Sequence, residues 1–553
     1  MNTLVPQRFA VQSSCLLALL LTMVLAAGCK VGPNYLRPAV PVKEDWLDAG
    51  HPKLIGEPQS PEQWWTVFED QKLDQLVQDA YRENLTLRVA GMRVLESRAQ
   101  LGIARGLLFP QTQTLNGTFQ HTQISQNRPN FFGTFPGFNL TPDDWTNTFA
   151  ASWELDFWGR YRRAIEAASA SLDSVVENYD DVLVILVSDT ANAYIDLRTL
   201  ERRVDYAREN ARLQAQTLKV IQDRFDNGRA ANLDLSQAAN NLAQTEALIP
   251  PLEAGRRIAA NRLSVLLGQP PSDLTGRLGA TAEIPKPPPQ VAVGVPADLL
   301  RRRPDVRRAE RDLAAQSARI GVAASDFYPH ISIGGTVGYE SKNFSQLFQG
   351  NSLFGAVGPS FSWNVLNYGR IWQNVRLQDA TFQRLAYVYQ AAVLNADLEA
   401  ENAIITYLKS QERVSALRRA VAEGKKAVAT VDQLFVEGKV DFNRVFTIQA
   451  ELVQIQDQLA ASEGDVAKSL VAIYRALGGG WEIRLSDSEL ESLPPPPEAA
   501  PPPAPIPAPA PAPNPLPAPK VPGAPSPPKD TTAVAPARKA LQVSAPRASL
   551  RGF

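Results

Sequence analysis

Cysteine and histidine are scarce in this chain of 553 residues. One of the two cysteines, Cys15, lies in an N-terminal stretch that we expect to be removed, which leaves Cys29 and no internal disulfide in the mature chain. The three histidines, His51, His121 and His330, are far apart in the sequence. Their spacing argues against a histidine-based metal site or acid/base catalyst.

A surplus of charge of one sign is missing as well. The formal net charge is −1 and both signs are mixed along the chain, whereas a nucleic-acid-binding protein needs a concentrated basic face. We interpret the short run Arg301-Arg302-Arg303 before Pro304 as a surface at the start of a helix. The chain has no Gly-Lys-Ser/Thr phosphate loop and no Gly-x-Ser-x-Gly motif. We therefore predict that it is not an enzyme, binds no metal and needs no cofactor.

Residues 1–28 have the composition of a secretory signal, with Arg8 followed by an apolar run from Cys15 to Ala27 that is too short to span a membrane comfortably. Leu25-Ala26-Ala27-Gly28-Cys29 resembles the signal of a bacterial lipoprotein. That resemblance implies cleavage before Cys29 and a covalent lipid on its thiol; ordinary cleavage that leaves a free thiol is the alternative. Lys30 is not the aspartate associated with retention in the inner membrane, which favours an outer-membrane address.

The rest of the chain contains two copies of one plan, residues 71–281 and 296–480, joined by a Pro-rich linker at 282–295. A long-period duplication of this kind decides the architecture. Four landmarks recur in the same order: Leu101-Gly102-Ile103-Ala104 with Phe109-Pro110 and Ile320-Gly321-Val322-Ala323 with Tyr328-Pro329; Trp153 with Gly159-Arg160 and Trp363 with Gly369-Arg370; Phe225 with Gly228 and Phe435 with Gly438; Leu267-Gly268 and Leu477-Gly478.

Each repeat contains one segment in which apolar and polar residues alternate, as in strands with two different faces. In the first, Leu115, Gly117 and Phe119 alternate with Asn116 and Thr118. The pattern predicts hairpins at about 113–157 and 330–365, with long connections at roughly 122–144 and 341–352. The chain therefore supplies four strands.

The segments after the hairpins are predicted to be long helices, because residues 161–226, 371–437 and 441–477 contain no proline. At 1.5 Å per residue the first two would each reach on the order of 100 Å. Apolar residues at alternating spacings of three and four, such as Val414, Leu417 and Val421, predict coiled-coil pairs. Gly228 and Gly438 mark the turns between them. Pro250-Pro251 predicts a kink or a break in the returning helix of the first repeat.

Four membrane strands cannot close a barrel, and an open sheet edge in hydrocarbon leaves backbone groups without hydrogen bonds. Two, three or four chains would give about eight, twelve or sixteen strands, all of which the even-number rule permits. The apolar strand faces would contact lipid, and Glu154, Asp156 and Glu340 are interpreted as solvated lining of an aqueous lumen. We expect six aromatic residues to form an interfacial girdle or to pack at the strand–helix junctions: Trp145, Trp153, Phe157, Trp158, Tyr339 and Trp363.

Over roughly residues 29–481 the sequence resembles the TolC-type outer-membrane efflux factors, especially the lipoprotein branch paired with resistance-nodulation-division (RND) pumps. The landmarks above carry this resemblance, together with Val31-Gly32-Pro33-Asn34-Tyr35, Arg37-Pro38, Trp64-Trp65 and Phe68. It implies a mainly α fold with a membrane β part: a homotrimer with a 12-stranded barrel and a long coiled-coil tunnel. Residues 29–70 would form the lipid-anchored N-terminal segment and part of an equatorial belt.

The resemblance also assigns roles at the far end of the tunnel. It places Gly228 and Gly438 at the tip that faces a periplasmic adaptor (a membrane fusion protein), and Asp234 where the family has an acidic partner in a closing bond. The opposite position departs from the family pattern, with Val440, Arg444 and Thr447 and with Lys439 nearby. A latch between Asp234 and Arg444 or Lys439 is one hypothesis; a pair of solvated surface charges worth ~0–1 kcal/mol is the alternative.

The sequence thus predicts the outer-membrane channel of a tripartite efflux system in a Gram-negative bacterium, a passive exit duct for small molecules handed over by an inner-membrane RND pump and an adaptor. Two alternatives are an exit duct for type I protein secretion and a pore-free periplasmic coiled-coil scaffold. Residues 481–553 are rich in proline and alanine and are predicted to be an extended, disordered tail.

Overall fold

The computed structural model describes residues 29–55, 61–125, 141–279, 283–294, 296 and 301–486. The predicted signal (1–28), part of the first strand connection and nearly all of the predicted tail lie outside these residues. The described part of the chain is one compact unit.

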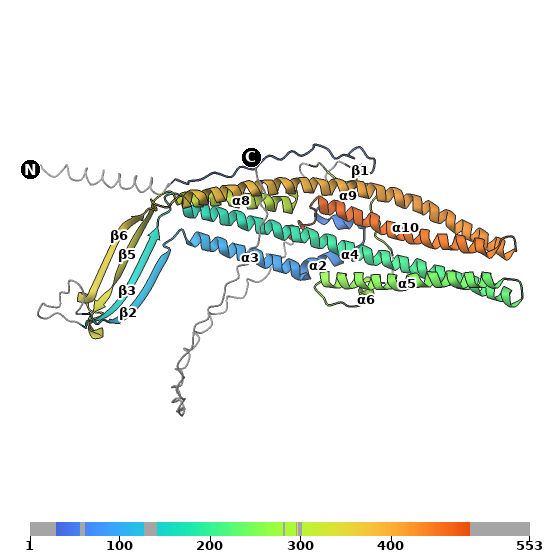
Figure 1. The fold of residues 1–553 in the computed structure, drawn as a ribbon, viewed down its shortest axis with the longest axis horizontal. Helices are drawn as coiled ribbons and strands as arrows, with labels where there is room; N and C mark the ends of the chain where they lie inside the picture. Colours follow the sequence, from blue (N-terminus) through green and yellow to red (C-terminus); the bar gives the residue numbers. More distant parts are fainter. Residues whose placement is uncertain are drawn as a thin grey trace, which may run out of the picture. The chain divides into compact units, whose positions relative to one another are not determined.

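The two predicted repeats appear as one order of elements used twice (Figure 1). The first comprises α3 (Leu85–Gly106), β2 (Thr112–His121), β3 (Asp143–Glu154), α4 (Arg160–Asp226) and α5 (Asn232–Leu266). The second comprises α8 (Pro304–Ser325), β5 (His330–Ser341), β6 (Leu353–Ser362), α9 (Arg370–Val436) and α10 (Phe442–Ala476). The shorter elements are β1 (Leu54–Ile55), η1 (Pro61–Phe68), α2 (Gln71–Glu83), α6 (Thr275–Leu278), β4 (Val291–Ala292), η2 (Phe344–Gln346), η3 (Gly350–Ser352) and α11 (Ile483–Ser486).

The long helices α4 and α9 have 67 residues each, and α5 and α10 have 35 each. Each pair folds back at a glycine with positive φ, Gly228 at 69° and Gly438 at 72°, a conformation that side chains with a Cβ rarely adopt. At both turns the amide after the glycine bonds a carbonyl five residues earlier: Arg229 N to Arg224 O at 2.7 Å and Lys439 N to Leu434 O at 2.9 Å. The predicted turns are confirmed.

A kink or a break was predicted at Pro250-Pro251; the break is wrong, because α5 runs without interruption through both prolines. Proline has no N–H and therefore removes a helical hydrogen bond at each position. Both prolines and the residues four positions before them, Glu246 and Ala247, are exposed, so water can bond the freed carbonyls.

The four longer strands form one antiparallel sheet in the order β2-β3-β5-β6. The register aligns Leu115 with Phe149, and Phe149 with Val337. Because side chains alternate along a strand, this register gathers the apolar positions of all four strands on one face. None of the helices in the described part of the chain combines the length and apolar character needed to cross a membrane.

The main core lies where η1 and α2 pack on α4 and α10. Trp64 stacks on Tyr474 with ring centroids 5.3 Å apart and meets Trp65 edge-on at 5.9 Å. Arg303 belongs to this packed region and is only 6% exposed, so the predicted arginine surface is wrong at this position. Its guanidinium donates to Ala476 O at 2.5 Å, at the end of α10, and pairs with Asp305 and Glu399.

The helices α4 and α10 are tightly packed at Gly464. A Cβ at this position would lie 2.2 Å from Thr199 Oγ1 and 3.1 Å from Thr199 Cβ. Thr199 cannot move away easily, because it is branched at Cβ and its hydroxyl bonds Ile195 O at 2.7 Å.

We expect Gly464→Ala to destabilise the protein by about 1–2 kcal/mol, since the overlap outweighs the better helix propensity of alanine. The measurement is the thermal unfolding midpoint of the purified protein in detergent. Thr199→Ala should restore the midpoint in the double variant. Gly91→Ala, in α3, is the control, because its new methyl group would be at an ordinary 3.7 Å from Tyr179. Equal midpoints for Gly464→Ala and Gly91→Ala would contradict this account of the packing.

Candidate functional site

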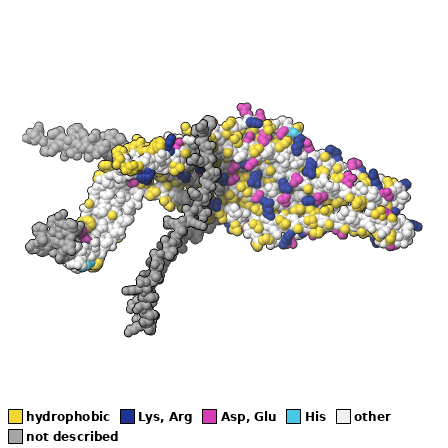
Figure 2. All heavy atoms as spheres, viewed as in Figure 1, with side chains coloured by type: hydrophobic (Ala, Val, Ile, Leu, Met, Phe, Trp, Pro, Cys, Tyr) yellow, Lys and Arg dark blue, Asp and Glu magenta, His cyan; other side chains and the backbone are white. Residues whose placement is uncertain are grey.

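The apolar face of the sheet is not covered by any described part of the chain. Val357 is 83% exposed, Phe361 75% and Leu115 71%, and Figure 2 shows few charged side chains over the strands compared with the helices. The opposite face carries small polar residues such as Thr114, Asn116 and Thr146. One apolar and one polar face is the arrangement expected of strands between lipid and water.

The two edges of the sheet are also open. Within the described residues, β2 pairs only with β3, and β6 pairs only with β5. The outward backbone N–H and C=O groups of β2 and β6 therefore need partners from outside the chain, above all in a membrane.

Tryptophans fasten the sheet to the helices in both repeats. Trp153 Nε1 donates to Leu108 O and Trp363 Nε1 donates to Phe327 O, each at 3.0 Å. Trp158 Nε1 donates to Pro329 O at 2.9 Å, and its ring stacks on Tyr328 at 4.6 Å. These three residues pack at the junction between strands and helices. Trp145, at the far end of β3, instead contacts Phe119 and Phe344.

The interpretation of Glu154 and Asp156 as solvated lining is wrong. Glu154 accepts from Tyr161 Oη at 3.0 Å and lies 2.8 Å from His330 Nδ1. The side chain of Asp156 is 8% exposed, accepts from the backbone N–H groups of Tyr161 and Arg162 at the start of α4, and pairs with the Arg162 guanidinium at 2.9 Å. These carboxylates bind the first turn of α4, where the helix leaves N–H groups free. Glu340 is exposed on the polar face of β5.

The segment after Cys29 is held at the same junction. Val31 N donates to Trp158 O at 3.1 Å. The Arg163 side chain, 1% exposed, donates to Val31 O, Gly32 O and Asn34 Oδ1 at 2.9–3.1 Å. Lys30 forms an ion pair with Glu166. Cys29 itself is exposed, so its Sγ is accessible beside the end of the sheet.

The two turns lie together at the other end of the helices and are called the tip (Figure 1). Arg224 of α4 joins them: its guanidinium donates to Phe435 O at 3.2 Å and Val436 O at 3.1 Å, and lies 4.5 Å from the centroid of the Phe435 ring. Beneath it, Ile221 and Phe442 belong to a small buried cluster. In the sequence, this contact could have been predicted from a basic residue four positions before the turn glycine, near the end of a helix.

The three residues of the predicted latch form no hydrogen bond or ion pair with one another within the described part of the chain. Asp234 accepts from Ala231 N at 3.1 Å, and Lys439 pairs with Glu437 at 2.6 Å. The Arg444 side chain is exposed, and its backbone N–H bonds Asp441 Oδ1 at 3.0 Å. Among the described residues no ion pair joins Asp234 to either cation, so a latch remains a prediction about contacts between copies.

The most buried carboxylates away from the sheet have structural partners. Asp180 is fully buried and binds the Arg484 guanidinium at 2.5 and 2.9 Å, and Glu177 binds Arg307 at 2.5 Å. Both arginines also lie over the Trp481 ring. Burial, opposed by Arg307, raises the pKa of Glu177 to about 7. This cluster fastens the segment after α10 to α4 and α8.

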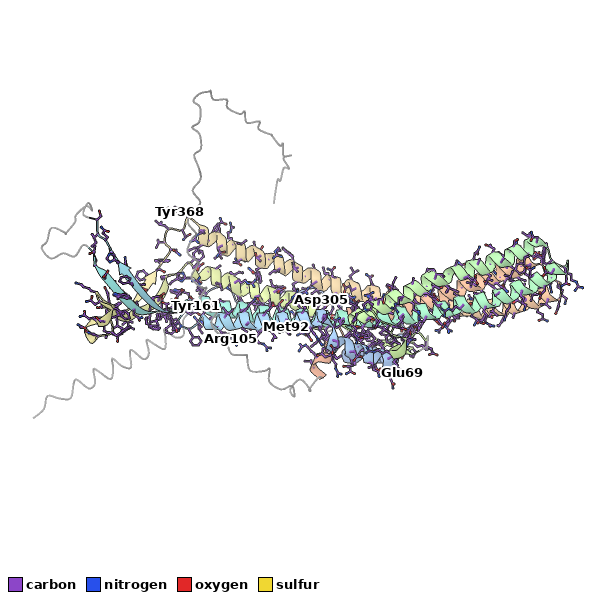
Figure 3. The ribbon with its side chains drawn as sticks, turned by 90° about the horizontal axis from the view of Figure 1, so that it is seen from below. Glu69, Met92, Arg105, Tyr161, Asp305 and Tyr368 are labelled. Carbon is purple, nitrogen blue, oxygen red and sulfur yellow. The ribbon has the colours of Figure 1, made fainter. Side chains whose placement is uncertain are left out.

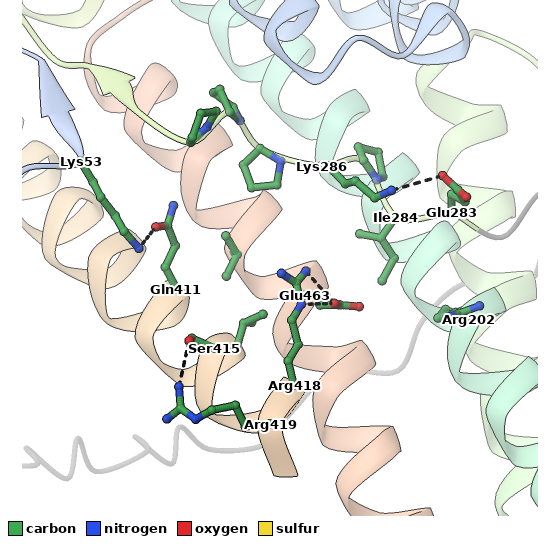
Figure 4. Close-up of a pocket in the computed structure, with 16 residues that line it drawn as sticks. Lys53, Arg202, Glu283, Ile284, Lys286, Gln411, Ser415, Arg418, Arg419 and Glu463 are labelled. Atoms are coloured by element: carbon green, nitrogen blue, oxygen red, sulfur yellow. Dashed lines mark hydrogen bonds and ion pairs between the residues drawn. The ribbon is translucent and has the colours of Figure 1, made fainter. Parts of the chain in front are cut away.

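A cavity of about 850 Å³ lies under the Pro-rich segment 283–289 and is bounded by α4, α9 and α10 (Figure 4). Arg418 pairs with Glu463 at 2.8 Å, and Lys286 lies 3.7 Å from Glu283. Lys53 bonds the Gln411 amide, and Arg419 bonds Ser415 Oγ at 3.3 Å. The charged groups are thus held by neighbours. Among the described residues no cluster of His, Cys, Asp and Glu could hold a metal ion.

The sequence and the fold match known proteins over most of their lengths. The profile of a family described as outer membrane efflux protein matches residues 76–269 and 295–479. Nodulation protein T of Rhizobium leguminosarum bv. trifolii is 29% identical over 458 residues, which cover 83% of this chain and 96% of that protein. Cation efflux system protein CusC of Escherichia coli (strain K12) is 26% identical over 473 residues, with coverage of 85% and 100%.

Two solved structures confirm the predicted fold class. The outer-membrane channel OprN shares 31% identity at a TM-score of 0.75, covering 82% of this chain and 100% of that one. The outer membrane channel CmeC of Campylobacter jejuni has a TM-score of 0.76, with coverage of 84% and 97%, and its 21% identity shows the fold alone.

Replacing Arg224 tests its role at the tip. We expect Arg224→Ala to remove about 1–2 kcal/mol from the stability of the α9–α10 turn, because two hydrogen bonds with a charged donor are lost. Amide hydrogen exchange in residues 430–440 should become faster. Arg229→Ala, at an exposed position on the same turn, serves as the control. Unchanged exchange in Arg224→Ala would show that the contact does not hold the tip together.

Proposed function

The chain belongs to the outer membrane efflux protein family, and from this premise we propose that it is the exit duct of a tripartite efflux system. In this proposal an inner-membrane RND pump supplies the energy, a periplasmic adaptor docks at the tip, and small toxic molecules leave passively through a homotrimer. The single observation that carries the duct is the four-stranded sheet with an exposed apolar face and two open edges.

The order of the helices supports closure by further copies. Within the chain α3 packs on α4, α4 on α8, and α8 on α9, parallel to the strand order β2-β3-β5-β6. Since α3 leads into β2 and α9 follows β6, pairing of β2 with β6 of the next copy places α3 beside the neighbour's α9. Three copies would give about twelve strands, an allowed number.

Exposed apolar side chains lie along α3 and along the half of α9 that is next to the sheet. On α3, where Figure 3 labels Met92, they are Leu85, Val89, Met92, Leu95 and Ile103. On α9 they are Leu377, Tyr387, Val388, Leu394 and Leu398. Apolar stripes at helical spacing on two outer helices are typical of surfaces that bury each other.

The duplication predicts which residues meet. Leu101 corresponds to Ile320, 219 positions later, and Trp153 corresponds to Trp363, 210 positions later. Inside the chain α4 meets α8 where Arg308 Nη1 bonds Asn178 Oδ1 at 2.8 Å. With the same offsets, Arg308 in the second repeat corresponds to Val89 in the first, and Asn178 in the first repeat corresponds to Val388 in the second. We therefore place Val89 against Val388 of the next copy, two apolar residues where the chain's own contact is polar.

The position of Cys29 supports a covalent lipid on its thiol. The exposed residue lies beside the strand–helix junction, so acyl chains attached there could reach the same leaflet that the ends of the strands contact. Lipidation would add a second hold on the outer membrane.

The cargo does not follow from the family. Relatives are named for cation efflux, for toluene efflux and for pyoverdine export, so members with this fold serve cargoes of different chemistry. We propose small toxic compounds as the class. A type I secretion duct has less support because these names refer to export of small molecules and ions, and a pore-free scaffold does not account for the exposed sheet.

Deletion of the gene tests the function. We expect the deleted strain to become more sensitive to at least one class of drugs, dyes, solvents or metal cations, and plasmid-borne wild type to restore resistance. The measurement is a growth-inhibition profile together with the set of secreted proteins. Loss of a secreted protein with an unchanged inhibition profile would favour protein secretion instead.

Cross-linking tests the assembly. The variant Val89→Cys/Val388→Cys should form disulfide-linked trimers under mild oxidation, since the corresponding residues inside the chain, Arg308 and Asn178, are in direct side-chain contact. Electrophoresis without reductant reads the result. In the control Val89→Cys/Leu398→Cys the second thiol is about 15 Å further along α9 and should cross-link poorly. Exclusively monomeric bands in both variants would contradict the proposed α3–α9 interface.

A further inference from the structure

A polar seam joins the two helical hairpins between the core and the tip. Its members on α4 recur every seven residues at Arg203, Asn210, Thr217 and Arg224, the spacing that returns to the same side of a coiled-coil helix. Arg203 binds Asp457 through two hydrogen bonds of 2.7 and 3.0 Å, and Asn210 donates to Gln456 Oε1 at 2.7 Å. These contacts pair each polar group with a complementary one.

At Thr217, the third position of the seam, the pairing of polar groups is incomplete. Gln449 Nε2 donates to Asp432 Oδ1 at 3.2 Å and lies 3.4 Å from Thr217 Oγ1. Among the described residues no cation forms an ion pair with Asp432, whereas the other carboxylate of the seam, Asp457, has Arg203. Burial raises the pKa of Asp432, against the effect of the Gln449 hydrogen bond.

A cavity of about 240 Å³ lies at this level, between α4, α9 and α10. Two amides that line it are more than nine-tenths buried and incompletely bonded. Gln214 is 4% exposed, and neither its Nε2 nor its Oε1 has a hydrogen-bond partner; Gln449 is 7% exposed, and its Oε1 has none. A buried polar atom without a partner costs about 1–3 kcal/mol, so three such atoms around one cavity require an explanation.

Asn210, Gln216 and Thr217 also line the cavity, and five aliphatic residues complete its wall. Leu213, Val220, Val428, Val436 and Leu452 surround the polar groups, and Leu213, Val220 and Val436 are partly open to the outside. The cavity thus presents one carboxylate, two unpaired amide oxygens and the unpaired Gln214 Nε2 beside aliphatic side chains.

We propose that this cavity binds a guanidinium or ammonium group carried on an aliphatic stem. The cation would complete the pairing of Asp432 and donate hydrogen bonds to Gln214 Oε1 and Gln449 Oε1, while the stem would contact the apolar wall, as the stems of arginine and lysine do on protein surfaces. An anion is disfavoured by the Asp432 carboxylate. The cation can come from a small organic molecule or from a basic side chain of a partner protein.

The test uses the full-length protein in detergent and does not depend on transport. n-Butylguanidinium is titrated by isothermal calorimetry, with n-butylurea as a neutral ligand of nearly the same shape. We expect saturable binding of the cation, one per chain, and no measurable binding of the urea. Equal binding of both ligands, or of neither, would overturn the proposal.

Variants locate the binding. Asp432→Asn should weaken the affinity for n-butylguanidinium about tenfold or more, a loss of 1.4 kcal/mol per factor of ten. Gln214→Leu should weaken it as well without loss of thermal stability, since it removes two unpaired buried atoms. Asp379→Asn, at an exposed position on the same helix, should leave the affinity unchanged. Wild-type affinity in a folded Asp432→Asn protein would refute the assignment.

A blocked alanine-rich helical peptide with one arginine separates the two sources. Binding of the peptide and of n-butylguanidinium, both lost in Asp432→Asn, supports a partner side chain as the occupant. Binding of the small cation alone supports a small organic molecule. Either result supports a site for a cation on an aliphatic stem, and the absence of binding by both ligands overturns it. This outcome is independent of what the deletion strain shows about efflux.

Discussion

The hydrogen-bonding requirement of two edge strands governs the rest of this structure. A sheet of four strands leaves the outer sides of β2 and β6 open, and a lipid environment offers no water to satisfy them. The apolar face of the same sheet is exposed over its full width. Both features call for partners from outside the chain, which the side-by-side copies of the proposed trimer would supply. The order of the long helices follows from the strands, because each helix continues directly from a strand or leads into one.

The duplication relates the α4–α8 interface inside the chain to the proposed α3–α9 interface between copies, which would have similar geometry and different chemistry. Inside the chain, α4 meets α8 through polar contacts such as Ser174 Oγ to Asp312 at 2.6 Å and Arg308 to Asn178. The corresponding positions on α9 and α3 include exposed valines. An interface within one chain forms at high effective concentration and can use polar pairs, whereas association of separate chains has to overcome lost translational freedom, which burial of apolar area offsets.

The sequence predicted the repeated plan, the four strands and the two turns because these follow from local patterns: alternation, uninterrupted helical stretches and a glycine at each reversal. The sequence-based predictions failed where a residue distant in the sequence determines the environment of a side chain. Arg303 reads as part of a surface run, but the end of α10 buries it. Glu154 and Asp156 continue a strand pattern, but the first turn of α4 and His330 engage them. Pro250-Pro251 predicts a break, but their solvent-facing position removes the need for one. Tertiary context overrides local preference in each case.

Contacts at the tip bear on how such a duct could widen. The seam from Arg203 to Arg224 ties α4 to α9 and α10 at four positions. Three of them are well paired, and the last of these is Arg224, which bonds two carbonyls at the turn. Separating the two hairpins of one chain would break these contacts together and expose the cluster around Ile221 and Phe442. Asp234, Lys439 and Arg444 are instead held by neighbours in their own turns or exposed. If the proposed trimer forms, movement between copies breaks none of the seam, so each chain would move as a unit and its surfaces toward the neighbours would part first.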